Sequence, residues 1–220
     1  MDSKNILKRL EQEFGDVSSP LIHETPFQLL VAVLLSAQTT DNQVNKITPQ
    51  LFHKFPSPKA MANATIKDIE ELIKTIGLYK TKAKNIHSLS KRLVSVYKEK
   101  VPSKMDELLT LPGIGRKSAN VVLQHSFKIN EGIVVDTHIG RIAVRLGLTT
   151  TTNSKDAVKI EKDLLKIIPE KDRERFGLYL IYHGRKTCTA KKAFCDKCSI
   201  AKYCKSAKKI KAYVPSHSIS

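Results

Sequence analysis

The sequence is short of long apolar runs. Its longest uninterrupted run, Leu29 to Leu35, has seven residues, whereas about 18 are needed to cross a bilayer. The N-terminal segment, Met1 to Gly15, mixes acidic and basic residues at helical spacing and lacks the apolar stretch of a secretory signal. We therefore expect no membrane span and a cytoplasmic location.

Acidic residues are also scarce. The chain has 21 Asp and Glu against 38 Lys and Arg, which gives a formal net charge of +17. The excess is uneven, because the stretch from Lys186 to Lys211 holds nine lysines and a single acid, Asp196. A surplus of this size favours a polyanionic partner such as a phosphate backbone over simple solubility. Charge alone assigns no function.

The sequence shows no alternation of polar and apolar residues typical of half-buried strands. Apolar residues instead recur at helical spacing almost everywhere. Thr25 followed by Pro26 has the pattern of a helix start, and Gly77 and Gly147 have the pattern of helix stops. The predicted fold class is therefore all-α, with short loops.

Three segments are less regular. Pro49 stands inside a helical pattern and should kink that helix or restart it behind Thr48. The helix expected over 157–168 follows a cap signal at Asn153-Ser154. The segment 126–136 breaks the helical period and is the best candidate for a crossing between two helical lobes.

All four cysteines lie in one short stretch with the spacing C-x6-C-x2-C-x5-C: Cys188, Cys195, Cys198 and Cys204. In a chain without a secretory signal, such a group is more typical of a metal centre than of disulfides. Structural zinc usually takes two short Cys-x2-Cys pairs, and only one is present. The spacing thus favours an iron-sulfur cluster and leaves zinc open.

The segment LPGIGRKS, 111–118, has the pattern of a tight turn between two helices. Pro112 and Gly113 suit the two central positions of a type II turn, and Gly115 allows a close approach of the backbone to a ligand. With an apolar helix on each side, this is a helix-hairpin-helix pattern. Its amides and its helix N-terminus can hold a phosphate.

Lys117 stands at the N-terminal end of the second hairpin helix, where the helix dipole disfavours a cation. The dipole and the adjacent Arg116 together favour the neutral amine that a Schiff-base nucleophile needs. A phosphate contact explains Lys117 equally well. Asp136 has the place of a helix N-cap, and an ionised cap can also accept a proton or stabilise a developing cation. His138 is more typical of a packing residue than of a substrate contact.

The segments LPGIGRKSANVV, VVDTH and HGRKTC, together with the four-cysteine loop, closely resemble the endonuclease III family of DNA glycosylases with associated AP lyase activity. The segments LLSAQTTD and TIGLYKTKAKNI are similar to that family as well. The resemblance extends from about Leu21 to Cys204. It implies a base-excision-repair enzyme that removes oxidised pyrimidines and cuts the strand by β-elimination.

The resemblance also implies an all-α, two-lobed enzyme. Residues 21–132 would form a six-helix domain that contains the helix-hairpin-helix at about 106–123. Residues 1–20 and 133–220 would form the second domain, where the four cysteines hold a [4Fe-4S] cluster in the loop 188–204. The partner would be double-stranded DNA with oxidised pyrimidines or abasic sites, bound between the lobes by a nucleoid-associated monomer.

Matching positions imply residue roles. Lys117 would attack C1′ of the damaged nucleotide as a Schiff-base nucleophile, with Asp136 as its partner carboxylate. Gln38 and Leu78 match residues that fill or wedge the stack left by a flipped base, although a helix-end polar residue and a surface leucine explain them as well. The other implied DNA contacts are Leu111, Gly113, Gly115, Arg116 and His138.

Two rival functions stay open at this point. A monofunctional mismatch or adenine glycosylase of the same superfamily would use water as the nucleophile, and Lys117 argues against it because those relatives carry a different residue there. A non-catalytic helix-hairpin-helix protein would use the hairpin and the cysteine loop only to grip phosphates. Covalent trapping on abasic DNA distinguishes both from a lyase.

Overall fold

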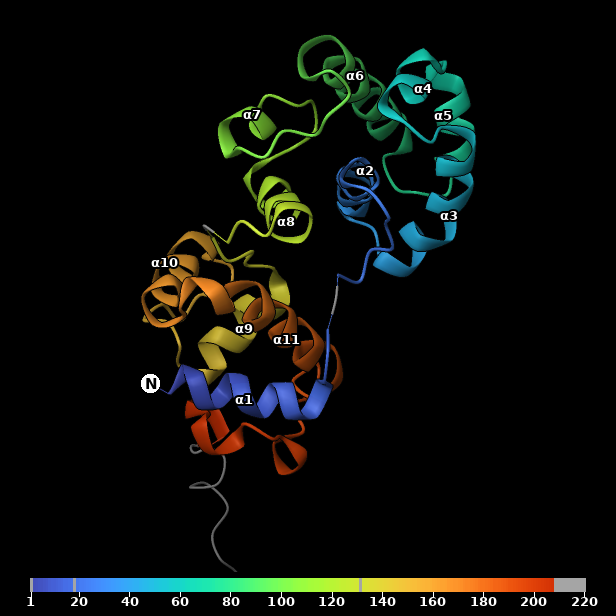
Figure 1. Ribbon diagram of the computed structural model, residues 1–220. Helices are drawn as coiled ribbons and strands as arrows, with labels where there is room; N and C mark the ends of the chain where they lie inside the picture. Colours follow the sequence, from blue (N-terminus) through green and yellow to red (C-terminus); the bar gives the residue numbers. More distant parts are fainter. Residues whose placement is uncertain (1, 18, 131, 208–220) are drawn as a thin grey trace, which may run out of the picture. The chain divides into compact units, whose positions relative to one another are not determined.

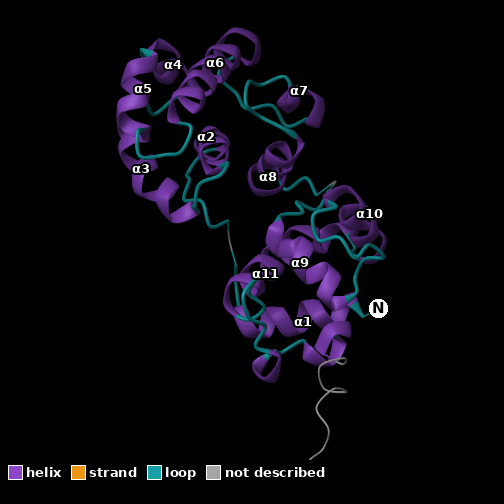
Figure 2. Ribbon diagram, turned by 180° about the vertical axis from the view of Figure 1, so that it is seen from behind, coloured by secondary structure: helices purple, strands orange, loops and turns teal. Residues whose placement is uncertain are grey.

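The computed structural model describes residues 2–17, 19–130 and 132–207. Within these ranges every regular element is a helix, and the only β pairing is one isolated bridge between Cys188 and Ala193 (Figure 2). The predicted all-α fold class is confirmed. None of the helices described is both long enough and apolar enough to cross a membrane.

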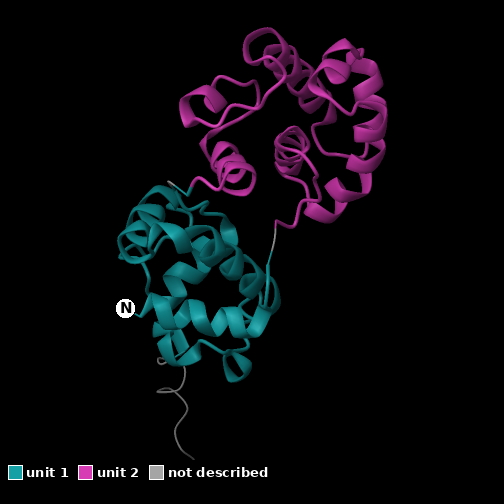
Figure 3. Ribbon diagram, in the orientation of Figure 1, with its two compact units in different colours: residues 1–18, 130–220 teal, residues 19–129 magenta. Residues whose placement is uncertain are grey.

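The chain divides into two compact units (Figure 3). One unit contains residues 1–18 and 130–220, and the other contains residues 19–129. The chain therefore passes between units inside the irregular segment 126–136. The sequence predicts limits of 21–132 for one domain and the remainder of the chain for the other. These limits differ from the division in the structure by a few residues.

The unit 19–129 is built around one apolar helix. Its helices are α2 (Pro26–Ser36), α3 (Asp41–Lys54), α4 (Pro58–Asn63), α5 (Ile66–Ile73), α6 (Tyr79–Tyr97), α7 (Met105–Leu109) and α8 (Arg116–Phe127) (Figure 1). Eight of the eleven residues of α2 are buried, and α3, α6 and α8 pack against it. A helix without a polar face must be covered on all sides, so the run Leu29 to Leu35 specifies the centre of this unit.

The other unit packs the N-terminal helix against the C-terminal half of the chain. Its α-helices are α1 (Ser3–Phe14), α9 (Thr137–Leu146), α10 (Ala157–Ile167) and α11 (Arg173–Lys186), and three short 3-10 helices are Glu170–Asp172, Cys195–Lys197 and Ala201–Tyr203. Helix α11 contacts both α1 and α9 and buries Phe176, Tyr179 and Leu180. The Tyr179 hydroxyl donates to the Gly15 carbonyl at 2.8 Å, which ties the end of α1 to α11.

Several helix ends agree with the expected caps. The Thr25 hydroxyl accepts from the Gln28 N–H at 3.2 Å ahead of Pro26, and Gly147 ends α9 with a φ of 80°. Both predictions are confirmed. Side-chain capping of this kind satisfies amides that have no partner inside the helix.

Two other predicted helix ends are wrong. The cap of α10 is Asp156, whose Oδ1 accepts from the Lys159 N–H at 3.1 Å. Asn153 instead closes a local turn, because its Oδ1 accepts from the Lys155 N–H. Helix α5 ends at Ile73, well before Gly77, and the left-handed residue nearby is Leu78. A polar side chain can close a turn or cap a helix, and spacing alone does not decide between these roles.

Pro49 does not restart its helix. Helix α3 continues through it from Asp41 to Lys54, so the restart predicted behind Thr48 is wrong. Thr48 is buried, and Pro49 is exposed on the outer face. The cost of the proline is therefore confined to the backbone, where it cannot donate to the Asn45 carbonyl.

We predict that Pro49→Ala raises the free energy of unfolding by about 2 kcal/mol. Alanine restores the missing backbone donor and removes no packing, because the proline ring is exposed. Urea unfolding followed by circular dichroism measures the change. The exposed neighbour Gln50→Ala is the matched control and should leave stability within about 0.5 kcal/mol of the starting protein. Equal stability of the two variants would contradict the prediction.

Candidate active site

The hairpin turn between α7 and α8 has the predicted geometry. The Ile114 N–H donates to the Leu111 carbonyl at 3.1 Å and closes a four-residue turn. Gly113 occupies its third position with a φ of 80°, as a type II turn requires. Leu111 and Ile114 are buried in the core of the unit 19–129, so they anchor the turn while Gly113 stays exposed.

The two hairpin glycines meet different surroundings. A Cβ atom on Gly113 would lie 2.8 Å from Asn85 Nδ2 and 3.0 Å from Leu34 Cδ1, so the turn packs tightly on α6 and α2. A Cβ atom on Gly115 would meet nothing within 4 Å. Gly115 is the N-cap of α8 and supplies no side-chain cap. No side chain caps the first amides of α8, so they are available to hold an anion.

Lys117 lies on the first turn of α8, and its side chain is exposed. Arg116 is exposed beside it. The hairpin therefore presents two cations next to a helix N-terminus, which strengthens the attraction for a phosphate or another anion. An exposed amine at this place is also free to reach an electrophilic carbon.

Gln38 and Leu78 share an unusual backbone conformation. Their φ angles are 56° and 60°, in the left-handed region that bulky side chains rarely occupy. Both are exposed, and the apolar Leu78 side chain is 62% exposed at the N-cap of α6. Strained backbone and exposed bulk together are typical of functional positions held in place by their surroundings.

Asp136 and His138 belong to the other unit. Asp136 is the N-cap of α9 and accepts from the Ile139 N–H at 2.8 Å, so its predicted capping position is confirmed. Among the described residues, the second carboxylate oxygen of Asp136 accepts no hydrogen bond and is available to another partner. His138 Nδ1 lies 3.3 Å from Arg141 Nη2, and its side chain touches α11 at Gly184. This packing accounts for His138, and its contact with DNA stays a prediction.

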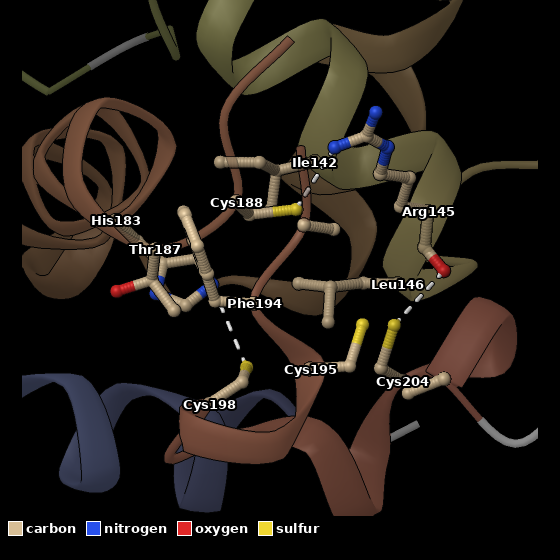
Figure 4. Close-up of a pocket in the computed structure, with 12 residues that line it drawn as sticks. Ile142, Arg145, Leu146, His183, Thr187, Cys188, Phe194, Cys195, Cys198 and Cys204 are labelled. Carbon is tan, nitrogen blue, oxygen red and sulfur yellow. Dashed lines mark hydrogen bonds between the residues drawn. The ribbon is translucent and has the colours of Figure 1, made fainter. Parts of the chain in front are cut away.

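The four cysteines line one pocket (Figure 4). None of them forms a disulfide. Their sulfur atoms face the same space from the end of α11 and from the two short 3-10 helices that follow it, and Ile142, Leu146 and Phe194 supply apolar walls. Arg145 Nη1 donates to Cys188 Sγ at 3.2 Å, and Cys198 Sγ lies 3.7 Å from His183 Nε2.

The pocket by itself opposes ionisation of two of the thiols. Burial, together with the neighbouring thiols, raises the pKa of Cys198 to about 11. Burial and the same neighbours also raise the pKa of Cys195. A cationic centre would reverse this effect, because thiolates bind metals and stabilise positive charge. Among the described residues, no three Cys, His, Asp or Glu side chains converge on a point suited to one metal ion.

Three residues were not predicted from the sequence as site residues: Lys82, Arg145 and His183. Lys82 is only 4% exposed on α6, although it looks like one of several lysines in its segment. The helical spacing could have indicated its burial, because Lys82 is in phase with the buried Ile86 and Leu89. No comparable signal marks His183, whose place beside Cys198 depends on the fold of the cysteine loop.

Known proteins match this chain over most of its length. The model of the HhH-GPD superfamily base excision DNA repair protein matches residues 31–170. Endonuclease III of Synechocystis sp. is 48% identical over 202 residues, which are 92% of this chain and 91% of that protein. The chain belongs to the endonuclease III family. Endonuclease III of Escherichia coli is 40% identical over 93% of this chain and 95% of its own length.

Solved structures of the endonuclease III family agree with this membership. A trapped endonuclease III–DNA covalent intermediate has a TM-score of 0.86 and 38% identity, and the match covers 96% of this chain and 99% of that one. A thermostable thymine-DNA glycosylase at 22% identity has a TM-score of 0.83 and shares the fold. The chain is thus a base-excision-repair DNA glycosylase for oxidised pyrimidines that also has AP lyase activity.

The two hairpin glycines give a matched pair of tests. We predict that Gly113→Ala lowers the free energy of unfolding by about 1–3 kcal/mol, because it combines a left-handed backbone with contacts near 3 Å. Gly115→Ala should change stability by less than about 1 kcal/mol, yet weaken binding to undamaged duplex by obstructing the approach of a phosphate. Urea unfolding and fluorescence anisotropy measure the two effects. Equal destabilisation by both variants would contradict this account of the hairpin.

Proposed function

We propose that Lys117 is the nucleophile of this glycosylase and lyase, and that Asp136 is its partner carboxylate. The observation that carries the proposal is the exposed amine of Lys117 on the hairpin of a chain whose relative, 38% identical, forms a trapped covalent intermediate with DNA. A covalent intermediate needs a protein nucleophile, and a neutral amine that attacks a sugar carbon forms a Schiff base.

The reaction balances with these two groups, the DNA and water. The Lys117 amine attacks C1′, the bond from C1′ to the oxidised pyrimidine breaks, and the base leaves with the bonding electrons and takes up a proton. The C1′–O4′ bond of the sugar then breaks, O4′ takes up a proton, and a protonated imine forms between C1′ and Lys117. This imine makes the C2′ proton acidic. Loss of that proton breaks the C3′–O bond by β-elimination, and water then releases Lys117. Asp136 would accept the ammonium proton before attack or stabilise the cation that develops at the sugar.

The hairpin would hold the DNA backbone on the α8 amides and the neighbouring cations. Leu111 keeps the turn seated, while Gly113, Gly115 and Arg116 form its outer surface. Contacts of this kind position the enzyme without reading sequence. Gln38 and Leu78 would fill the stack that a flipped pyrimidine leaves, which explains why bulky exposed side chains are held on strained backbone.

We further propose that Cys188, Cys195, Cys198 and Cys204 hold a [4Fe-4S] cluster. A zinc ion with sulfur ligands at about 2.3 Å would need all four thiols around one point. The cysteines instead line one pocket with apolar walls, which suits a compact four-iron cluster. A cluster supplies a compact anchor for the loop and its lysines. Acting on chromosomal DNA, the enzyme would work at the nucleoid, and one chain carries all the proposed residues, so we expect a monomer.

The nucleophile is tested by Lys117→Gln. We predict that this variant folds, binds a duplex with a tetrahydrofuran abasic analogue, and gives no borohydride-trapped adduct on a true abasic site. Its single-turnover cutting should fall at least about a thousandfold, as for loss of a covalent nucleophile. Arg116→Gln is the matched control, since it removes the adjacent exposed cation and should reduce affinity while trapping persists at saturating enzyme. If Lys117→Gln were trapped at the same rate as the unsubstituted protein, another amine would be the nucleophile.

Asp136→Asn separates capping from chemistry. Asn caps helices about as well as Asp, so stability should stay within about 0.5 kcal/mol. If the carboxylate acts only as a cap, base excision is unchanged. We predict instead that excision of an oxidised pyrimidine falls by about a hundredfold or more, while trapping of an existing abasic site falls less. Single-turnover kinetics on the two duplexes give both numbers, and full excision activity would sink the role of Asp136.

Metal analysis tests the cluster. We predict that anaerobically purified protein is yellow-brown and contains about four irons and four sulfides per chain, as expected of a cubane on four cysteines. Cys195→Ser should lower the iron content and the affinity for DNA. Replacement of Ser199, a neighbouring residue that is not a thiol, by Ala should leave the iron content unchanged. Stoichiometric zinc in place of iron would overturn the assignment.

A further inference from the structure

Lys82 is a buried lysine whose ammonium is used inside the protein. It lies on the first turn of α6 and is 4% exposed. Its Nζ donates to the Leu35 carbonyl at 2.9 Å, to the Ala37 carbonyl at 2.7 Å and to the Thr39 hydroxyl at 3.0 Å. All three acceptors belong to the segment 35–39, so one side chain binds the whole segment that carries Gln38.

The burial of this ammonium is costly. Removing a cation from water destabilises it, and burial accordingly lowers the pKa of Lys82. The three acceptors are uncharged, and they use all three donors of the ammonium. A buried apolar side chain would avoid the desolvation cost but could not bind these oxygens. The Lys82 ammonium therefore loses its hydration, and in return its hydrogen bonds fix the segment 35–39.

The loop that Lys82 holds is strained. Helix α2 ends at Ser36 without the glycine that usually takes the left-handed position after a helix. Gln38 adopts that conformation instead, with a φ of 56°. The ammonium also lies at the C-terminal end of α2, where the helix dipole favours a cation. Such strain persists only where the surroundings over-determine the backbone, and Lys82 supplies three of the necessary bonds.

Lys82 also contacts the segment that carries Leu78. Its backbone N–H donates to the Leu78 carbonyl at 3.0 Å, in the first turn of α6. A second bond joins the residues next to these segments, because Gln43 Nε2 on α3 donates to the Thr75 hydroxyl, three residues ahead of Leu78, at 3.0 Å. Lys82 therefore holds the segment of Gln38 through its side chain and bonds Leu78 through its backbone.

We propose that Lys82 is a positioning residue that sets Gln38 relative to Leu78 and makes the two act as one wedge in the DNA stack. The inference rests on the proposed stack-filling role of Gln38 and Leu78, and it adds the residue through which their placement is fixed. Lys82 itself touches no DNA. It acts through the segment 35–39, so its loss should matter only where a stacked duplex must be opened.

The test compares Lys82→Met with Ile86→Ala. Methionine is similar in length and donates no hydrogen bond, whereas Ile86→Ala makes a cavity one turn along α6 and leaves the Lys82 bonds intact. Both variants are assayed well below their thermal midpoints, with binding to undamaged duplex as a common reference. Gln38→Ala and the double variant Lys82→Met with Gln38→Ala complete the set.

Two readouts report on the wedge, and one does not. A 2-aminopurine placed opposite a tetrahydrofuran abasic analogue brightens when it is unstacked in the complex. Single-turnover excision from duplex measures the productive flipped state. Cutting of an abasic site in single-stranded DNA needs no wedge, because no duplex stack has to be opened. A purely structural defect would lower all three.

We expect Lys82→Met to lose most of the 2-aminopurine signal and about tenfold to a hundredfold in duplex excision, the loss typical of a misplaced group, while single-stranded cutting is retained. Ile86→Ala should keep the 2-aminopurine signal, duplex excision and single-stranded cutting. The double variant should lose no more than the more impaired single variant, because Lys82 acts through Gln38. Should Lys82→Met fail to fold, Thr39→Val removes one of its acceptors and should give a smaller loss in the same two duplex readouts.

The contrary outcomes are separable. If the losses of Lys82→Met and Gln38→Ala multiply, or if Lys82→Met lowers single-stranded cutting as much as duplex excision, the positioning role is wrong while the wedge stands. If Gln38→Ala changes neither duplex readout while Lys117 still traps DNA, the stack-filling role of Gln38 fails and the inference falls with it. Wild-type behaviour of Lys82→Met beside an impaired Gln38→Ala overturns the inference alone.

Discussion

The burial of α2 on all sides is the constraint on which the unit 19–129 depends. An apolar helix with no polar face has to be enclosed, and α3, α6 and α8 enclose it. Each of these contacts also places a proposed functional part. Leu34 touches the hairpin at Gly113, the end of α2 carries Gln38, and Leu35 accepts a bond from the buried Lys82. The hydrophobic core and the proposed DNA-opening surface are therefore built on the same helix.

Positive charge is distributed in two distinct ways in this protein. Most of the +17 excess is on exposed lysines and arginines, where it attracts a phosphate backbone and costs little in desolvation. At Lys82 the charge is buried and is used as a three-way hydrogen-bond donor. Arg145 is intermediate, because it donates to Cys188 Sγ and to the Thr189 carbonyl in the partly buried cysteine pocket. Composition reports only the first of these uses.

Residues with a left-handed backbone differ in how much strain that conformation costs them. Gly113 and Gly147 take positive φ cheaply, and each ends or turns a helix. Gln38 and Leu78 take it at a cost and are exposed. A glycine at either position would relieve the strain but would leave no side chain to enter a DNA stack. The choice of bulky residues there is what connects backbone geometry with the proposed flipping of a pyrimidine.

Local sequence determined much of this protein. The all-α class, the Thr25 cap, the type II turn at Gly113 and the cap at Asp136 all follow from interactions within a few residues, and the cysteine group is a linear cluster. The ordered motifs were also sufficient to indicate the endonuclease III family. Local signals failed where two neighbouring groups competed, as at the α10 cap and at the end of α5.

Tertiary structure decided the features that depend on partners distant in the sequence. Pro49 stays within a continuous helix because it faces outward while Thr48 and the rest of the inner face are held by the core. Lys82 reads as one lysine among several, and only the approach of the segment 35–39, more than 40 residues away, makes it a buried clamp. The convergence of the cysteine sulfurs on one pocket likewise requires the fold of α9 and α11. The physical reason is common to all three, since burial and hydrogen bonding over long sequence separations are properties of packed surfaces and leave only weak traces in local pattern.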